Sequence, residues 1–200
     1  QIDEEESMSF DIRVERTKEP KEKPDENHLG FAKYFTDHMF CADWTEDEGW
    51  HDFRVVPHKP ILIEPASCVL HYAQMMFEGM KAYRAPDGDV LLFRPDMNEK
   101  RMEKTCERMC IPMLPKGLLV EAIRSLIQTD ESWVPSKEGT ALYIRPFIFG
   151  DEVSFSVLPA KHYRFMIILT PTGSYYAAND GGLSTTRIFV QDKYIRAAEG

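Results

Sequence analysis

The chain has 200 residues, of which 43% are hydrophobic and 28% charged, and its formal net charge at pH 7 is −9. These values are typical of an ordinary soluble globular chain of one or two domains. The acidic balance argues against a nucleic-acid partner, which needs a basic stripe, and no apolar run is long enough to span a bilayer. We therefore expect a cytoplasmic protein whose partners are neither nucleic acid nor membrane.

Residues 1–27 are rich in Glu, Lys and Pro and hold too little apolar surface to pack alone. They predict a charged arm, mobile or draped over the surface, in which Phe10–Val14 could form an edge strand. We expect order to begin near Phe31, with a strand and turn over 31–39 and a hairpin over Asp43–Trp50.

The next segment carries one short strand and one helix in our prediction. Ile61–Ile63 reads as a short buried strand. Val69–Glu78 has a helical period, with Ser67 placed to cap its beginning and Gly79 placed to end it.

A hairpin and a helix follow. Met80–Arg84 and Val90–Phe93 alternate as strands around Pro86–Gly88, a turn in which Pro fixes φ and Gly accepts positive φ. Pro95 suits the first turn of a helix, where its missing N–H costs little. The helix's predicted core-facing stripe consists of Met102, Cys106 and Met109.

The remaining elements complete an α+β fold. Leu118–Thr129 is a second amphipathic helix, and Ala141–Phe149 and Tyr163–Thr170 are strands. Helices mixed with antiparallel hairpins, without regular βαβ alternation, favour an α+β domain with a mixed or antiparallel sheet and flanking helices. The predicted divisions are the arm at 1–27, a small domain at 28–172, a linker at 173–182, and the start of a second domain at 183–200.

The cysteines and histidines show no metal-binding pattern. Cys41, Cys68, Cys106 and Cys110 form no C-x-x-C pair, and none lies near a His at zinc-finger spacing. We expect packed thiols, with oxidation between Cys106 and Cys110 as the alternative. No metal site is predicted.

Tyr143 and Arg145 are the sharpest chemical signal within a predicted strand. Residues two apart in a strand share a face, so a phenol and a guanidinium should lie side by side. Such a pair can bind a carboxylate, the Arg through charge-assisted hydrogen bonds and the Tyr through its O–H. The alternative is a surface Arg beside a half-buried Tyr.

Arg101 is the second candidate, because it follows Asn98-Glu99-Lys100 and precedes the core-facing Met102. An Arg at the edge of a buried stripe can reach a phosphate, although a solvated helix charge is the simpler alternative. Tyr72 and Phe77, close to Gly79 in sequence, could wall an apolar pocket, or each could be ordinary core.

Several motifs in the same order resemble the branched-chain amino-acid aminotransferases, which use pyridoxal phosphate and have the D-amino-acid-aminotransferase-like fold (fold type IV). They are the runs His71–Arg84, Asn98–Met102, Leu142–Pro146 and Tyr194–Ala197. The resemblance covers residues 31–200. It implies the N-terminal domain of that fold and a protein that works as a homodimer.

The resemblance also implies roles for single residues. Arg101 and Arg196 would bind the cofactor phosphate, Tyr143 and Arg145 would bind the substrate carboxylate, and the aromatic residues would line an apolar pocket. Those aromatic residues are Phe31, Tyr72 and Phe77. The guanidinium of Arg101 and the phenol of Tyr143 should then face one hollow.

The implied reaction moves the amino group of leucine, isoleucine or valine to 2-oxoglutarate. It needs a lysine that forms a Schiff base with the cofactor. Lys193 precedes Arg196 on the wrong side of the motif, so we expect that lysine beyond Gly200 and assign no catalytic residue here. The alternatives are another enzyme of the same fold, such as a D-amino-acid aminotransferase or aminodeoxychorismate lyase, or a non-catalytic binding module.

Overall fold

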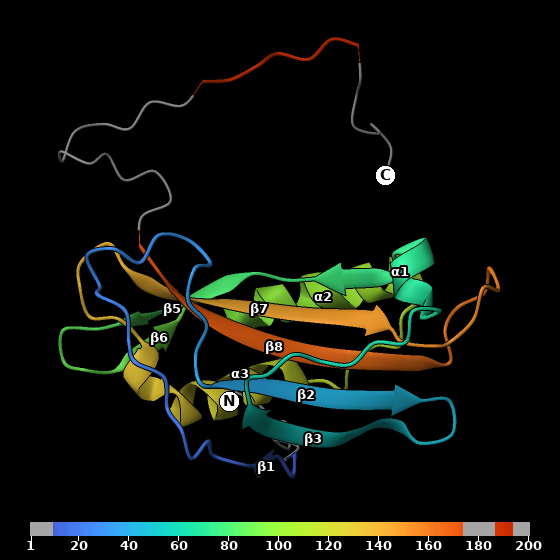
Figure 1. Ribbon diagram of the computed structural model, residues 1–200, viewed down its shortest axis with the longest axis horizontal. Helices are drawn as coiled ribbons and strands as arrows, with labels where there is room; N and C mark the ends of the chain where they lie inside the picture. The colour runs from blue at the N-terminus through green and yellow to red at the C-terminus, as the bar shows by residue number, and fades with distance from the viewer. Residues whose placement is uncertain (1–9, 174–186, 194–200) are drawn as a thin grey trace, which may run out of the picture.

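A computed structural model describes residues 10–173 and 187–193. Its central feature is one eight-stranded sheet with strand order β1-β3-β2-β8-β7-β5-β6, to which β4 adds by pairing with β7 (Figure 1). The strands are β1 Arg13–Val14, β2 His38–Thr45, β3 Gly49–Pro57, β4 Met75–Phe77, β5 Met80–Arg84, β6 Val90–Leu92, β7 Ala141–Gly150 and β8 His162–Thr172. The helices are α1 Cys68–Tyr72, α2 Pro95–Met109 and α3 Leu118–Thr129, followed by a 3₁₀ turn at Glu131–Trp133.

The sheet is mixed, as expected. Strand β1 runs parallel to β3, and the other pairings are antiparallel. Strands β2, β8 and β7 form its centre, and their side chains alternate between two faces.

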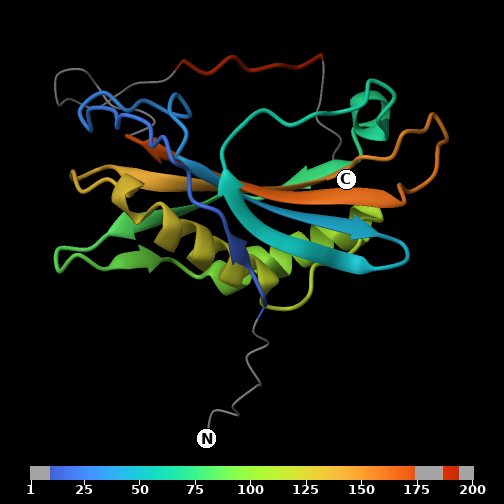
Figure 2. The same cartoon turned by 60° about the horizontal axis from the view of Figure 1, so that its bottom comes forward.

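One face of the sheet is covered by α2 and α3 (Figure 2). Helix α3 directs six buried residues at the sheet, and these residues produce the apolar period of its sequence. Together with Phe40, Ile144, Ile148 and Phe165 they belong to the main core.

The opposite face carries no α2 or α3. A smaller core there contains Met39, Cys41, Phe149 and Met166. Helix α1 and the chain leading into it pass over this face at one end, and the segment before β2 lies over the other (Figure 2). This second face, which we call the α1 face, carries the odd-numbered side chains of β7, including Tyr143 and Arg145.

Most of the predicted elements are confirmed. The β2–β3 and β5–β6 hairpins form, Gly88 has a φ of +96°, and α3 has the predicted bounds. Pro95 begins α2, in which Met102 and Cys106 are buried. The end of α2 turns away from the core and leaves Met109 37% exposed. The prediction that Met109 belongs to the buried stripe is therefore wrong.

The predicted helix over Val69–Glu78 is wrong beyond its first turn. Helix α1 ends at Tyr72, and Ala73 closes it in the left-handed conformation at φ 52°. Residues 75–77 pair with the edge of β7 instead, because the backbone hydrogen bonds of that edge would otherwise remain unpaired. Ser67 lies at the N-cap, but its hydroxyl donates to Asp151 and not to the helix.

Two shorter predictions are also wrong. Ile61–Ile63 forms no strand, and Leu62 is 91% exposed, so this run lies over the sheet without joining it. The stretch 31–37 is bends and irregular chain, and strand β2 begins only at His38.

In the described part of the arm, residues 10–27, β1 pairs with β3 and the chain after it is anchored at His38. The side chains of His38 and Asp130 are 5% and 2% exposed, and Nδ1 of His38 lies 2.6 Å from Asp130 Oδ1. The backbone N–H of Thr17 donates to Nε2 at 2.8 Å. Because Nε2 accepts, the imidazole is neutral and its proton sits on Nδ1. This chain of bonds joins the arm, β2 and the end of α3.

The cysteines follow the packing prediction except at one position. Cys41, Cys68 and Cys106 are buried, whereas Cys110 is exposed because it follows α2 in the left-handed conformation, at φ 53°. Within residues 10–173 and 187–193, no helix combines the length and apolar character that crossing a bilayer requires. Strand β8 ends at Thr172, and the predicted domain scheme stays a prediction.

Candidate functional site

Strand β7 brings Tyr143 and Arg145 together as its alternation requires. Both are half-buried on the α1 face, and Nη2 of Arg145 donates to the Tyr143 hydroxyl at 2.8 Å. The prediction of a neighbouring phenol and guanidinium is confirmed.

Two aromatic rings complete this group. The guanidinium carbon of Arg145 lies 4.4 Å from the centroid of the Phe77 ring, a cation–π distance. The ring of Phe31 meets that of Tyr143 edge to face at 5.2 Å. We call Phe31, Phe77, Tyr143 and Arg145 the aromatic–arginine cluster. Four of the predicted substrate-binding residues therefore meet in one place.

The local reason for Phe77's position is the pairing of β4 with β7. Phe77 opposes Phe147, so it lies diagonally from Arg145 on the same face. It is 60% exposed and Phe31 is 39% exposed, so apolar surface faces solvent beside a cation.

Gly79 permits the close approach of Tyr143. Its φ is not positive, so its role is not that of a helix cap. A Cβ at this position would collide with the Tyr143 hydroxyl and lie 3.1 Å from its Cζ. Only glycine leaves room for the phenol here.

Arg101 extends from α2 to Glu78, the residue that precedes Gly79 in the sequence. Its Nε and Nη2 donate to the two carboxylate oxygens at 2.5 and 2.6 Å. The carboxylate is 3% exposed and the guanidinium side chain 65%. The ion pair therefore has a buried anion and a cation at the surface.

Glu78 receives two further hydrogen bonds, from Asn98 Nδ2 at 3.0 Å and from the Gly79 backbone N–H at 3.2 Å. Burial raises the pKa of Glu78, but the donors from Arg101, Asn98 and Gly79 outweigh it and hold the pKa below its ordinary value. The carboxylate is therefore ionised at neutral pH.

The two predicted anion-binding groups thus reach consecutive residues. Arg101 holds Glu78, and Tyr143 packs against Gly79. That the two side chains open onto one hollow stays a prediction, because the hollow described below is lined by neither of them.

Tyr72 lies apart from the cluster. Its hydroxyl donates to the carbonyl of Phe155 at 2.5 Å, and its ring neighbours His71. Helix α1 lies beside the C-terminal end of β7, whereas Tyr143 is near its start (Figure 1). Arg196 falls outside the described residues.

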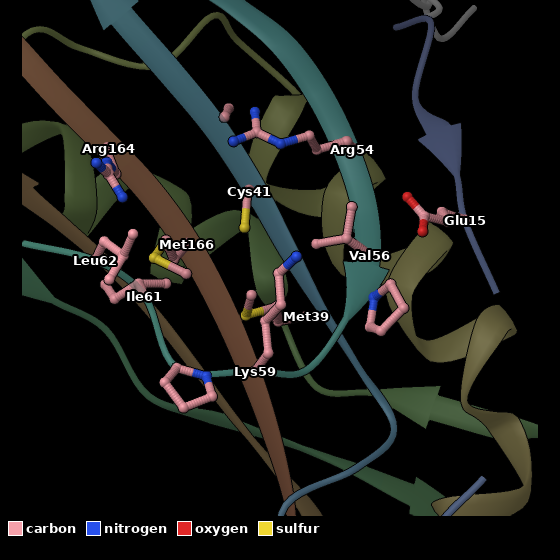
Figure 3. A pocket seen from close by; sticks show the side chains of 13 residues that line it. Glu15, Met39, Cys41, Arg54, Val56, Lys59, Ile61, Leu62, Arg164 and Met166 are labelled. Carbon is pink, nitrogen blue, oxygen red and sulfur yellow. The ribbon is translucent and has the colours of Figure 1, made fainter. Parts of the chain in front are cut away.

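A hollow of about 440 Å³ lies elsewhere on the α1 face (Figure 3). Its floor is apolar, with Met39, Cys41 and Met166. Arg54 and Arg164 at its rim are already neutralised, by Asp43 and Asp52 for the first and Asp151 for the second. Two of the three cations that line the hollow are therefore already used in ion pairs, and the third is Lys59.

Sequence reasoning missed Glu78 and Asn98 as members of the site. Asn98 was visible within the run that contains Arg101, and Glu78 stands between Phe77 and Gly79, but nothing local marks its carboxylate as buried. Among the residues that the structure describes, no group of three His, Cys, Asp or Glu side chains could hold a metal ion.

No family model matches the chain. Several individual proteins do match the chain. It is 50% identical over 189 residues to branched-chain-amino-acid transaminase 1 of Bacillus subtilis, a match that covers 94% of this chain and 52% of the relative. A branched-chain-amino-acid aminotransferase of Mycolicibacterium smegmatis is 43% identical over 172 residues, 86% of this chain and 46% of the relative. The chain thus spans about half the length of the curated relatives it matches, and the resemblance inferred from the motifs is confirmed along it.

Solved structures bear out the fold. The branched-chain amino acid aminotransferase of Thermobaculum terrenum, solved in its PLP form, matches with a TM-score of 0.52 at 17% identity, over 69% of this chain and 41% of that one. The Escherichia coli enzyme gives 0.50 at 23% identity, over 68% and 41%. The expected N-terminal domain of fold type IV is confirmed.

Proposed function

We propose that the protein carrying this chain is a branched-chain amino-acid aminotransferase, which uses pyridoxal phosphate to move the amino group of leucine, isoleucine or valine to 2-oxoglutarate. The aromatic–arginine cluster is the observation that carries the proposal. It joins a carboxylate-binding pair to apolar rings, which are the two features that an aliphatic amino acid requires. The named relatives support it.

The cluster is suited to a carboxylate on chemical grounds. The Tyr143 oxygen accepts a hydrogen bond from Arg145, so its own O–H is free to donate outward. Arg145 uses one N–H for that bond, and its remaining donors can meet a carboxylate. Both groups would hold the same end of the substrate.

Phe77 and Phe31 supply the apolar side. Burying an aliphatic side chain against such rings contributes about 0.8 kcal/mol per methylene. Selectivity between side chains that differ by one methylene is limited to about 1–3 kcal/mol, so we expect leucine, isoleucine and valine all to be accepted. The motif also assigns Tyr72 to the apolar pocket, but its ring lies apart from Phe77 and Phe31, so its role is proposed from the motif alone.

Arg101 fits the phosphate of the cofactor. The Nε–H and one Nη2–H of Arg101 are bonded to Glu78. Three of the five guanidinium N–H groups therefore remain for an anion at the surface. Arg196 is proposed as a second phosphate ligand from its motif. When bound, pyridoxal phosphate supplies an electron sink for chemistry at the amino-acid α-carbon. The residues described here bind and orient, and we assign none to the covalent attachment of the cofactor.

Two further parts of the proposal come from the sequence, the oligomeric state through the resemblance and the location through the composition. We propose a homodimer, and a cytoplasmic location. Sedimentation of the purified protein and fractionation of the native cells would test them.

The test is a transamination assay of the intact protein loaded with pyridoxal phosphate. We expect glutamate to form from L-leucine and 2-oxoglutarate with ping-pong kinetics. D-alanine and aminodeoxychorismate serve as comparison substrates. Turnover of either without turnover of any branched-chain amino acid would favour another enzyme of this fold and overturn the proposal. No turnover of any of them, with no cofactor absorption band, would favour a binding module.

A further inference from the structure

Glu78 is the most deeply buried carboxylate in contact with the candidate site. At 3% exposure it accepts four hydrogen bonds, from two nitrogens of Arg101, from Asn98 and from the Gly79 N–H. A buried charge needs such compensation, since an ionised carboxylate without partners would be strongly unfavourable. The arrangement fixes the carboxylate in one position.

That fixed carboxylate in turn fixes Arg101. A free Arg side chain on a helix surface samples many rotamers, and ordering it carries an entropic cost. Here Glu78 holds the guanidinium through its Nε edge. The opposite edge, with both N–H groups of Nη1 and one of Nη2, is directed away from the carboxylate by the planar geometry of the group.

A second side-on pair of an Arg and a carboxylate, at the start of α2, lacks these properties. Arg94 Nε and Nη2 donate to the two oxygens of Asp96, each at 2.9 Å, but the two side chains are 60% and 50% exposed. The same bonds therefore form in solvent, where they fix neither partner strongly. This difference indicates that the Glu78–Arg101 pair has a role other than that of an exposed ion pair on a helix surface.

We propose that Glu78 is a positioning residue that holds Arg101 in the orientation that receives the phosphate of the cofactor. This proposal deepens the function given above and depends on it. Glu78 itself does not touch the phosphate, and it acts by removing the rotamer freedom that phosphate binding would otherwise have to restrict. Asn98 and Gly79 hold the carboxylate in turn.

The test compares binding of pyridoxal phosphate and of pyridoxal, which lacks the phosphate, to the cofactor-free intact protein by absorbance titration. In Glu78→Gln, the loss of one or two charge-assisted bonds to Arg101 should raise the Kd for pyridoxal phosphate by about tenfold or more. The Kd for pyridoxal should change less than about twofold, because only the phosphate uses Arg101. Asp96→Asn is the matched control and should change neither constant.

The variants Arg101→Met and Glu78→Gln/Arg101→Met complete the cycle. We expect Arg101→Met to weaken pyridoxal phosphate binding and Glu78→Gln to add nothing in its presence. An effect of Glu78→Gln that persists without Arg101, or that falls equally on pyridoxal, would mean a general structural role and overturn this inference alone. No effect of Arg101→Met, or no binding of pyridoxal phosphate by the unmutated protein, would overturn the phosphate site and the inference with it.

Arg101→Lys covers the case in which Glu78→Gln does not fold. Lysine keeps the charge but lacks the fork that can meet a carboxylate and a phosphate on two edges. Weaker binding of pyridoxal phosphate with unchanged pyridoxal binding supports the inference. Binding of pyridoxal phosphate as tight as in the unmutated protein would contradict it.

Discussion

The hydroxyl of Tyr143 occupies the space into which a side chain at Gly79 would project. The two residues belong to neighbouring antiparallel segments, and Tyr143 is held from its other sides by Arg145 and Phe31. The phenol can therefore reach this position only because residue 79 has no Cβ.

Gly79→Ala should displace Tyr143 and destabilise the fold by about 1–3 kcal/mol, the usual cost of overpacking. Gly173→Ala is the matched control, since its Cβ would meet its nearest atoms at 4.0 Å and its φ is not positive. That change should alter stability by less than about 1 kcal/mol. Urea unfolding measures both. Tyr143→Phe should relieve part of the Gly79→Ala cost, and no relief would contradict the contact.

Leu126→Ala should cost about 2–5 kcal/mol, because Leu126 is fully buried in α3 and its removal leaves a cavity. Leu62→Ala makes the same chemical change at a residue that is 91% exposed, and should cost less than about 0.5 kcal/mol. Thermal unfolding compares the two. A large loss of stability in Leu62→Ala would instead indicate that Leu62 is buried, as the strand predicted from the sequence requires.

Asp130→Asn should destabilise the protein by about 1–3 kcal/mol, since both carboxylate oxygens accept from His38 and an amide NH₂ would face a donor. Asp47→Asn, at an exposed position in the β2–β3 turn, is the control and should be nearly neutral. The measurement is urea unfolding at neutral pH. Equal stabilities of the two variants would contradict the buried pair.

The stabilising effect of Glu78 should depend on pH. Because its pKa in the folded chain lies below the ordinary value of 4.5, its contribution is fully present above that value. It is lost as the pH falls through the folded pKa. The difference in unfolding free energy between the unmutated chain and Glu78→Gln should thus be constant near neutral pH and shrink below about pH 4.5. A difference that does not vary down to about pH 3 would argue against an ionised, bonded carboxylate.

One thiol should react rapidly with Ellman's reagent in the folded protein, and Cys110→Ser should abolish that reaction. Cys110 is exposed, whereas burial raises the pKa of both Cys41 and Cys106 to about 11 and withholds the reactive thiolate. Denaturant should release the remaining thiols. Rapid loss of more than one thiol in the folded state would contradict the packing described here.

Part of the site was predictable because it depends on one strand. The alternation of β7 puts Tyr143 and Arg145 on one face whatever the rest of the chain does. Phe31 and Phe77 were expected to join them from the resemblance, and the structure brings them there. The sequence could not show that Tyr72 lies apart from these residues, because the distance between its ring and theirs depends on where α1 ends.

The sequence alone determined the elements whose periodicity is local, such as α3 and the two hairpins, since apolar spacing and turn residues act over a few positions. Only the tertiary structure decided that 75–77 pair as a strand, because an apolar run of that length fits a helix equally well until the edge of β7 offers it hydrogen bonds. The same packing buries Glu78. A carboxylate that reads as surface charge in the sequence becomes the fixed partner of Arg101 because β4, β5 and α2 close around it.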